Sequence, residues 1–134
     1  MDKYIGSMLG GRYQIEEIVG VGGMAVVYRA RDTILGRDVA LKVLKKEFAE
    51  DPDIRKRFSI ESRAVAKLSH HNIVSVFDVG SEDGTDYIVM ELIEGITLKQ
   101  YLQRKGHLSW QETIFFAEQV ARALMHAHSR GIIH

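Results

Sequence analysis

The 134-residue sequence contains no cysteine and only one proline. Without cysteine the chain can form no disulfide and no thiolate metal site, which fits a reducing compartment. It also has no excess of charge, because 18 basic side chains balance 18 acidic ones and the formal net charge is zero. A surface dedicated to nucleic acid needs a basic excess, so we expect no nucleic-acid partner.

Long hydrophobic runs are missing as well. No apolar stretch is long enough to span a bilayer, and residues 1–12 lack the basic start and apolar run of a signal peptide. We therefore expect no membrane segment in these residues and a cytoplasmic location. A membrane anchor elsewhere in a longer parent protein remains compatible with this sequence. The hydrophobic share of 46% is enough for the core of one domain or of part of one.

The chain up to about Gly95 alternates between apolar strands and polar turns. One helix interrupts this pattern, with Asp51 as its cap, Pro52 in its first position and an end near Ser69. The predicted strands form an antiparallel sheet of five, with a turn over residues 81–84 between the last two. They cover residues 13–20, 25–31, 39–44, 73–79 and 87–91.

From Thr97 onwards the pattern is helical. A short helix over residues 97–105 ends at Gly106. A long one over residues 109–130 begins at a capping box of Ser109 and Glu112. Strands followed by helices predict the α+β fold class. The apolar side chains of the long helix spread over more than one face; they include Trp110, Ile114, Phe115, Phe116, Val120 and Leu124.

A glycine-rich turn over residues 20–25 joins the first two predicted strands. Taken alone, it is equally well explained as an ordinary flexible hairpin. A dinucleotide site requires such a turn to open a helix, and a Walker loop requires Gly-Lys-Ser/Thr, and neither condition is met. Glycines do let backbone N–H groups approach phosphate oxygens closely, so a hairpin that covers phosphates is the functional interpretation.

Lys42 lies on the third predicted strand. Alternation places it on one face with Ala40 and Leu44, and the small Ala40 leaves room there for a flat base. The alternative is a surface lysine on a half-exposed strand.

Glu61 falls on the stripe that Phe58 and Val65 form along the first predicted helix. A buried carboxylate needs a cationic or hydrogen-bonding partner, and Lys42 is the natural candidate. The alternative is that Glu61 sits at the edge of the stripe and reaches water.

The histidines predict no metal site. His126 and His128 are two positions apart on a helix and point to different sides, so they cannot share a metal ion. The strand over residues 87–91 runs into a polar bend whose backbone could bind an adenine edge. Without the other elements this segment would be merely a buried strand.

Together these residues resemble the N-terminal half of a protein kinase domain, most closely that of bacterial, eukaryotic-like Ser/Thr kinases. The resemblance covers Arg12 to His134. Many members of that group are membrane-anchored sensors with extracellular modules that recognise cell-wall material, which implies a bacterial source. The segments that carry the resemblance are residues 20–25, 39–42, 68–74, 87–91 and 127–134.

The resemblance implies transfer of the ATP γ-phosphoryl group to protein Ser/Thr, with Mg²⁺ in the complete kinase. Lys42 would hold the α- and β-phosphates and pair with Glu61. Met90 would be the gatekeeper, with Glu91 and Ile93 offering hinge backbone atoms. The remaining nucleotide-binding positions are Val19, Gly20, Val21, Gly22, Gly23, Met24, Ala25, Val27 and Ala40.

The resemblance also implies a division of the chain. Residues 1–11 would be an N-terminal extension, residues 12–94 the N-lobe, and residues 95–134 the end of the hinge and the start of the C-lobe. Ala25 stands where the family has its third glycine, a habit of the bacterial group, and His71 stands where proline is usual.

His134 matches the histidine of the His-Arg-Asp catalytic loop. The family's catalytic aspartate, metal-binding asparagine and Asp-Phe-Gly segment come after it. We therefore expect the 134 residues alone to be inactive and to form a homodimer through the long helix. The alternative function is a non-catalytic module for nucleotide binding or dimerisation; the gene sequence beyond His134 would discriminate between the two.

Overall fold

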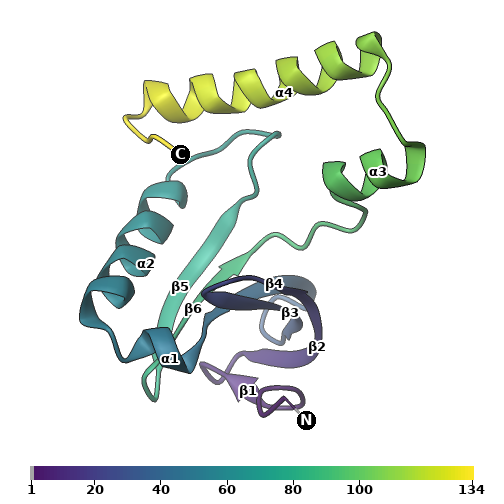
Figure 1. The fold of residues 1–134 in the computed structure, drawn as a ribbon. Coiled ribbons are helices and arrows are strands. Elements are labelled where there is room, and N and C mark those ends of the chain that lie inside the picture. Colours follow the sequence, from purple (N-terminus) through teal and green to yellow (C-terminus); the bar gives the residue numbers. More distant parts are fainter. Residues whose placement is uncertain (1) are drawn as a thin grey trace. The chain divides into compact units, whose positions relative to one another are not determined.

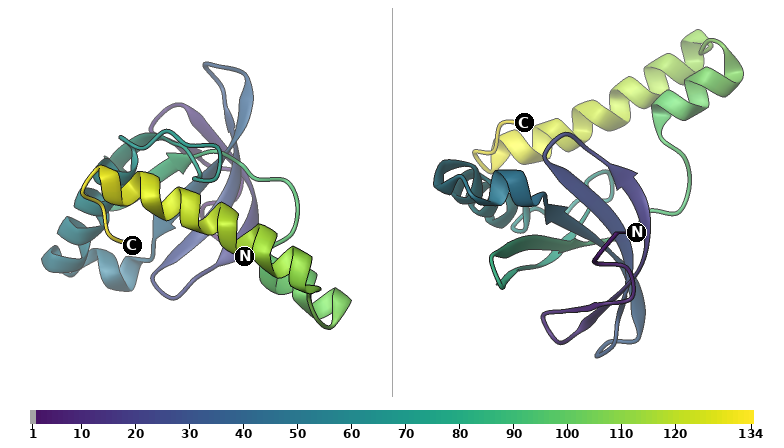
Figure 2. Two further views of the ribbon diagram at one scale, coloured as in Figure 1. Left: turned by 90° about the horizontal axis from the view of Figure 1, so that it is seen from above. Right: turned by 60° about the horizontal axis from the view of Figure 1, so that its bottom comes forward.

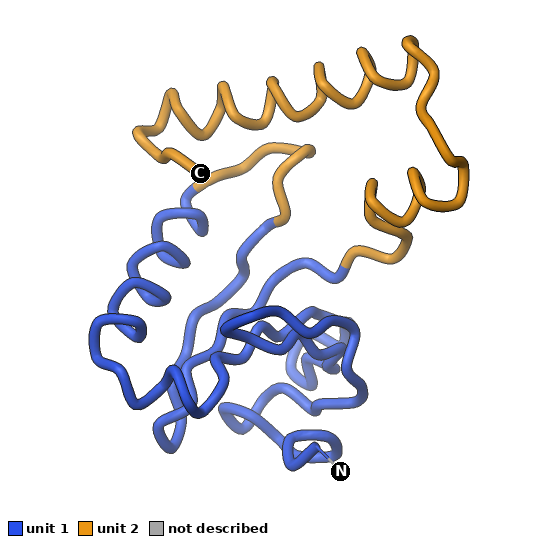
Figure 3. Tube along the Cα trace, viewed as in Figure 1, with its two compact units in different colours: residues 1–67, 75–92 blue, residues 68–74, 93–134 orange. Residues whose placement is uncertain are grey.

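The computed structural model describes residues 2–134. Met1, the first residue of the expected N-terminal extension, lies outside the described residues. The chain divides into two compact units (Figure 3). The first takes in the chain up to Lys67 together with Ser75–Leu92, and the second takes in Leu68–Val74 and Ile93–His134.

The first unit is built on one antiparallel sheet of six strands in the order β1-β2-β3-β4-β6-β5 (Figure 1). The five predicted strands are all present. The sixth, β1, was missed because its two residues carry no alternation pattern. The strands are β1 (Met8–Leu9), β2 (Tyr13–Val21), β3 (Ala25–Asp32), β4 (Arg37–Leu44), β5 (Val76–Glu82) and β6 (Thr85–Met90).

Short turns set the order of these strands. Asp83 and Gly84, both at positive φ (47° and 76°), form the two-residue connection between β5 and β6. Between β3 and β4, the Asp32 carboxylate accepts the N–H groups of Ile34 and Leu35 at 3.1 Å each, and Gly36 completes the turn at φ 66°. The polar turn predicted between the last two strands is therefore present.

Two helices belong to the first unit, α1 (Lys46–Ala49) and α2 (Pro52–Val65). Asp51 caps α2 as predicted, because its carboxylate accepts the N–H groups of Asp53 and Ile54 at 2.9 and 3.3 Å. The helix ends at Val65, four residues earlier than expected.

The sheet curls, as Figure 2 shows, and has a core on each face. One cluster is enclosed by the strands and the N-terminal segment. The other lies where α1 and α2 cover the sheet, and it joins Leu44 and Ile88 to Phe58. The first cluster comprises Leu9, Tyr13, Ile15, Tyr28, Ala30, Val39, Leu41, Val43, Tyr87 and Val89.

The second unit contains α3 (Leu98–Lys105) and α4 (Trp110–Ser129). Both helices begin with a capping box: Thr97 with Gln100 in α3, and Ser109 with Glu112 in α4, the latter as predicted. Gly106 ends α3 at φ 86°.

The segment Leu68–Val74 is tied to α4 within this unit. The Asn72 amide donates to the backbone and side-chain oxygens of Gln119, both at 3.0 Å. No helix in residues 2–134 is both long and apolar enough to cross a membrane.

Candidate functional site

The strand register brings four of the predicted nucleotide-binding side chains onto one face of the sheet. Val27 pairs with Lys42, and Ala40 pairs with Met90. Directly paired residues, and residues two apart on a strand, point to the same side. Val27, Ala40, Lys42 and Met90 therefore share what we call the Lys42 face. Ala40 is 5% exposed, whereas Lys42 is exposed.

The edges of this face differ in how firmly the backbone is held. Val19 lies at an irregularity of the β2–β3 register between Ile18 and Gly20 and is 50% exposed. The Glu91 N–H donates to the Ser75 carbonyl at 2.9 Å, and its carboxylate accepts the Ser75 N–H at 3.2 Å. Of its two backbone groups, Glu91 is thus left with its carbonyl to offer to an adenine edge. Ile93, the other expected hinge position, belongs to the second unit.

Hydrogen bonds hold the glycine-rich turn both from within and from the residue that follows β4. Within the turn, the Gly22 N–H donates to the Ala25 carbonyl at 2.8 Å. From the end of β4, Lys45 donates twice to the turn: its N–H to the Met24 carbonyl and its Nζ to the Gly23 carbonyl, both at 2.9 Å. No local pattern in the sequence indicates a role for Lys45, although the antiparallel register places the residue after Leu44 opposite the residue before Ala25.

Glu61 lies on the exposed side of α2. The buried face of the helix runs through Phe58 and Ser62, which are four positions apart. Glu61, three positions after Phe58, therefore lies at the edge of that face. The expectation of a buried Glu61 is wrong, and the alternative, an edge position in contact with water, is what the helix shows. Among the described residues Lys42 and Glu61 form no ion pair; their pairing around a bound nucleotide stays a prediction.

An ion pair anchors α2 to the sheet instead. Arg55 donates to both carboxylate oxygens of Asp86 in β6, at 2.6 and 3.0 Å. The Arg55 guanidinium is the main cause that lowers the pKa of Asp86. Arg55, six positions before Glu61, therefore holds the helix that carries Glu61 against the sheet.

A buried acid, Asp32, was also missed from the sequence. Asp32 receives a two-pronged contact from the Arg12 guanidinium at 2.9 and 2.8 Å. This hydrogen bonding, with the N–H groups of the following turn, lowers the pKa of Asp32 well below its usual range. The pair holds the start of β2 against the end of β3, so its role is structural. An aspartate that ends a strand and precedes a turn was its only sequence signal.

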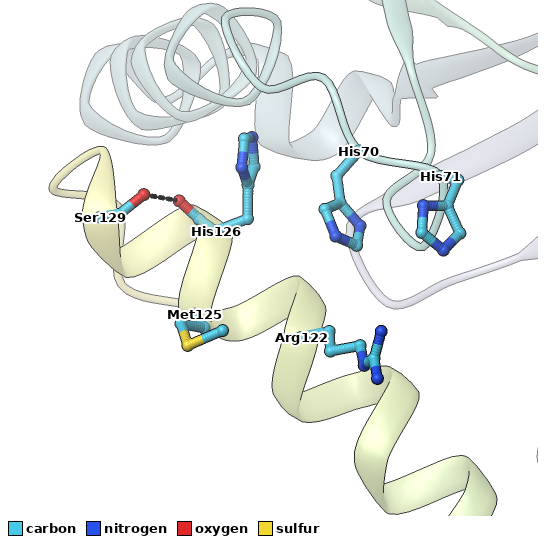
Figure 4. Close-up of a pocket in the computed structure, with 6 residues that line it drawn as sticks. All are labelled: His70, His71, Arg122, Met125, His126 and Ser129. Carbon is cyan, nitrogen blue, oxygen red and sulfur yellow. Dashed lines mark hydrogen bonds between the residues drawn. The ribbon is translucent and has the colours of Figure 1, made fainter.

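The second unit contains a histidine cluster on the side of α4 that meets Leu68–Val74 (Figure 4). The rings of His70 and His71 stack at 4.7 Å, and His70 lies 5.3 Å from His126. Burial, followed by the charges of His71, His126 and Arg122, lowers the pKa of His70. Residues 2–134 contain no group of three or more side chains that could hold a metal ion. The histidine cluster forms part of a pocket, whose lining residues are His70, His71, Arg122, Met125, His126 and Ser129.

Comparison with known proteins identifies the family of this chain. The model of the protein kinase domain matches residues 13–134. A probable serine/threonine-protein kinase of Clostridium acetobutylicum is 48% identical over 130 residues, 97% of this chain and 20% of the relative. PrkC of Bacillus subtilis is 46% identical with the same coverage, and PknA of Mycobacterium tuberculosis is 43% identical over 100% of this chain and 32% of its own.

Solved structures agree with the sequence comparison. The kinase domain of Mycobacterium tuberculosis PknI superposes with a TM-score of 0.87 at 32% identity, covering 100% of this chain and 55% of that one. The chain thus spans between a fifth and a third of the curated relatives and about half of a solved kinase domain. A sheet with the Lys42 face on one side, the family match and the superposition lead to one conclusion: the chain belongs to the protein kinase family.

Proposed function

We propose that residues 1–134 are the ATP-binding part of a bacterial Ser/Thr protein kinase of the membrane-anchored sensor group, acting on the cytoplasmic side. The observation that carries the proposal is the Lys42 face, where an exposed lysine pairs with Val27 beneath the glycine-rich turn. A lysine ammonium there offers a charge-assisted hydrogen bond to phosphate oxygens. The buried Ala40 beside it leaves space for adenine.

Lys42→Met tests this proposal. Because a hydrogen bond to a charged group contributes about 1.5–3 kcal/mol, we expect ATP to bind at least about tenfold more weakly, as measured by calorimetric titration. Lys46→Met is the matched control, since Lys46 is another exposed lysine that begins α1. Equal ATP affinity in wild type and Lys42→Met would remove Lys42 from the nucleotide site.

We further propose that these residues alone transfer no phosphoryl group. The family's Mg²⁺ ligands follow the His-Arg-Asp histidine, and no described residues form a group that could replace them. Phosphoryl transfer depends on that metal and on positioning of the acceptor hydroxyl. Metal-dependent transfer of labelled phosphate from ATP by the pure 134-residue chain would contradict this statement.

The exposed apolar side chains of α4 favour a second role, pairing of two copies of the chain. Trp110, Ile114, Phe115 and Val120 are each more than half exposed. Burying such a side chain contributes about 1.5–3 kcal/mol, and a twofold contact would cover some of these side chains on both copies. Light scattering at micromolar concentration should give the mass of a dimer.

Replacing Ile114 and Phe115 together by Ser should restore the mass of a single chain. Ile60→Ser is the control, because Ile60 is a 56% exposed apolar residue of α2 in the other unit. A monomeric, well-folded wild-type chain would exclude this role.

A further inference from the structure

We propose that Lys45 is a positioning residue, which turns the backbone N–H of Met24 toward the phosphate-binding side of the glycine-rich turn. The inference rests on the proposed ATP-binding function and extends it to a residue outside the Lys42 face. Lys45 would contact no nucleotide atom itself. It would act through the backbone of the turn.

The contacts that carry the inference are the two hydrogen bonds from Lys45 to consecutive carbonyls. Its Nζ reaches the Gly23 oxygen at 2.9 Å, and its own N–H reaches the Met24 oxygen at 2.9 Å. The second bond continues the β3–β4 ladder by one residue and belongs to the main chain. The first depends on the lysine side chain alone, so it is the bond that a substitution can remove.

Peptide geometry converts these bonds into an orientation of N–H groups. In a planar trans peptide, the carbonyl of one residue and the N–H of the next point in opposite directions. With the Gly23 carbonyl directed at the Lys45 ammonium, the Met24 N–H is directed away from it. A backbone N–H that has no partner in the chain and points out of the turn is a donor for an anion.

The direction is set by the face on which Lys45 lies. Alternation along β4 puts position 45 on the side of Val43, opposite Lys42 and Ala40. In agreement, Lys45 lines one pocket together with Val26, Tyr28 and Val43. A carbonyl drawn to this side leaves the N–H of the same peptide on the Lys42 side.

The Met24 N–H, which Lys45 orients, and the neighbouring Gly23 N–H are not used by the protein itself. Within residues 2–134, the N–H groups of Gly23 and Met24 have no hydrogen-bond partner in the chain. The glycine at position 23 also leaves open space around its α-carbon. Nothing in the described chain therefore competes with a phosphate oxygen for these two donors.

The test compares nucleotide binding by Lys45→Met, Lys45→Arg and Lys46→Met chains. Losing the orienting bond should weaken ATP binding about three- to tenfold in Lys45→Met, the range for one hydrogen bond. Adenosine, which has no phosphate, should bind all chains equally. Lys45→Arg should recover most of the ATP affinity. Lys46→Met removes the same charge one residue away and should bind ATP like wild type.

Equal ATP affinity in Lys45→Met and Lys46→Met would overturn the inference, because the effect would then be one of charge alone. The amide NMR signals of Gly23 and Met24 in the nucleotide-free chains provide a second measurement, and we expect them to shift only in Lys45→Met. If wild type binds neither ATP nor adenosine, the proposed function fails. The role of Lys45 is then decided by these amide signals, and unchanged signals would refute it.

Discussion

Different interactions stabilise each of the two units of the chain internally. In the first, ten residues of the sheet form a continuous buried cluster, and several of them, such as Ala30, Val39 and Leu41, are completely inaccessible. In the second, Ala127 is the one buried residue of α4, and α3 has none within the described chain. Burial of apolar surface thus stabilises the first unit, whereas capping and side-chain hydrogen bonds contribute more to the second.

This difference in packing indicates which unit can hold a binding site in a fixed geometry. The Lys42 face belongs to the unit whose strands are fixed by packing on both sides. A phosphate-binding turn needs such a rigid support, because donors must stay aimed at their acceptor. The helical unit carries no expected catalytic residue, and its long helix α4 exposes several large apolar side chains, among them Trp110, Ile114 and Phe115.

Truncating a core side chain should give the largest effect and separate the two units most clearly. Leu41→Ala removes a side chain with 0% exposure and should lower the free energy of unfolding of the first unit by about 2–5 kcal/mol. Val120→Ala, at a position 55% exposed in α4, should change stability by no more than about 0.5 kcal/mol. Urea unfolding followed by hydrogen exchange of each segment checks both. Equal losses would mean that α4 is packed as firmly as the sheet.

Overpacking the same core should have the next largest effect. A Cβ added at Gly80 would collide with the ring of Tyr87, which is 6% exposed and cannot easily move. Gly80→Ala should therefore reduce the free energy of unfolding by about 1–3 kcal/mol. Gly23→Ala is the control, since a Cβ there meets nothing within 4 Å. Thermal unfolding that leaves Gly80→Ala unchanged would show that this part of the sheet yields.

Removing a cap should affect the helical unit by a smaller amount. The Ser109 hydroxyl oxygen accepts the Glu112 N–H at 3.2 Å, and losing such a cap costs about 1 kcal/mol of helix stability. Ser109→Ala should therefore speed hydrogen exchange at the start of α4 and leave the strands unchanged. Thr113→Ala removes a hydroxyl in the same turn that donates to the Ser109 carbonyl at 2.9 Å but accepts no helix N–H, so it should have a smaller effect than Ser109→Ala. Equal exchange in the two variants would argue against the cap.

The smallest effect should be a pH dependence confined to the helical unit. Hydrogen bonds from Lys105 and then Tyr101, both at 2.5 Å, lower the pKa of Glu112 to about 2. A carboxyl whose pKa is lower in the folded state stabilises the fold above its usual pKa, and this contribution is lost as the pH falls toward 2. The stability of α4 should decline from about pH 4.5 downward.

Glu112→Gln is the control for this pH dependence, because it cannot ionise. In this variant, the stability of α4 measured by hydrogen exchange should change less with pH over the same range. An equally steep decline in wild type and Glu112→Gln would assign the titration to another group.

Local patterns were sufficient to predict most elements. Asp51 and Pro52 gave the start of α2, Ser109 and Glu112 that of α4, and alternation gave five of six strands. These signals depend on neighbours within four residues along the chain, so they can be detected without knowledge of the fold. The end of α2 was predicted less accurately, since the helix finishes at Val65 with Ala66 as its C-cap, four residues before the expected end.

The candidate site could be predicted only in part. The sequence alone gave the residue types of the Lys42 face, because a glycine turn and a lysine on an alternating strand are local features. The exposure of Glu61 was not predictable, since the buried face of the helix runs through Phe58 and Ser62 and leaves Glu61 outside it. Lys45 was missed because its partner, the Gly23 carbonyl, lies 22 positions away along the chain.

By itself, the sequence determined which segments are strands, helices and turns and which chemical groups each carries. The tertiary structure decided which of these groups meet: Arg12 with Asp32, Arg55 with Asp86, and Lys45 with the glycine-rich turn. The physical reason is that secondary structure follows from local periodicity and caps. A contact between distant residues is fixed only when the strand register and core packing are chosen together.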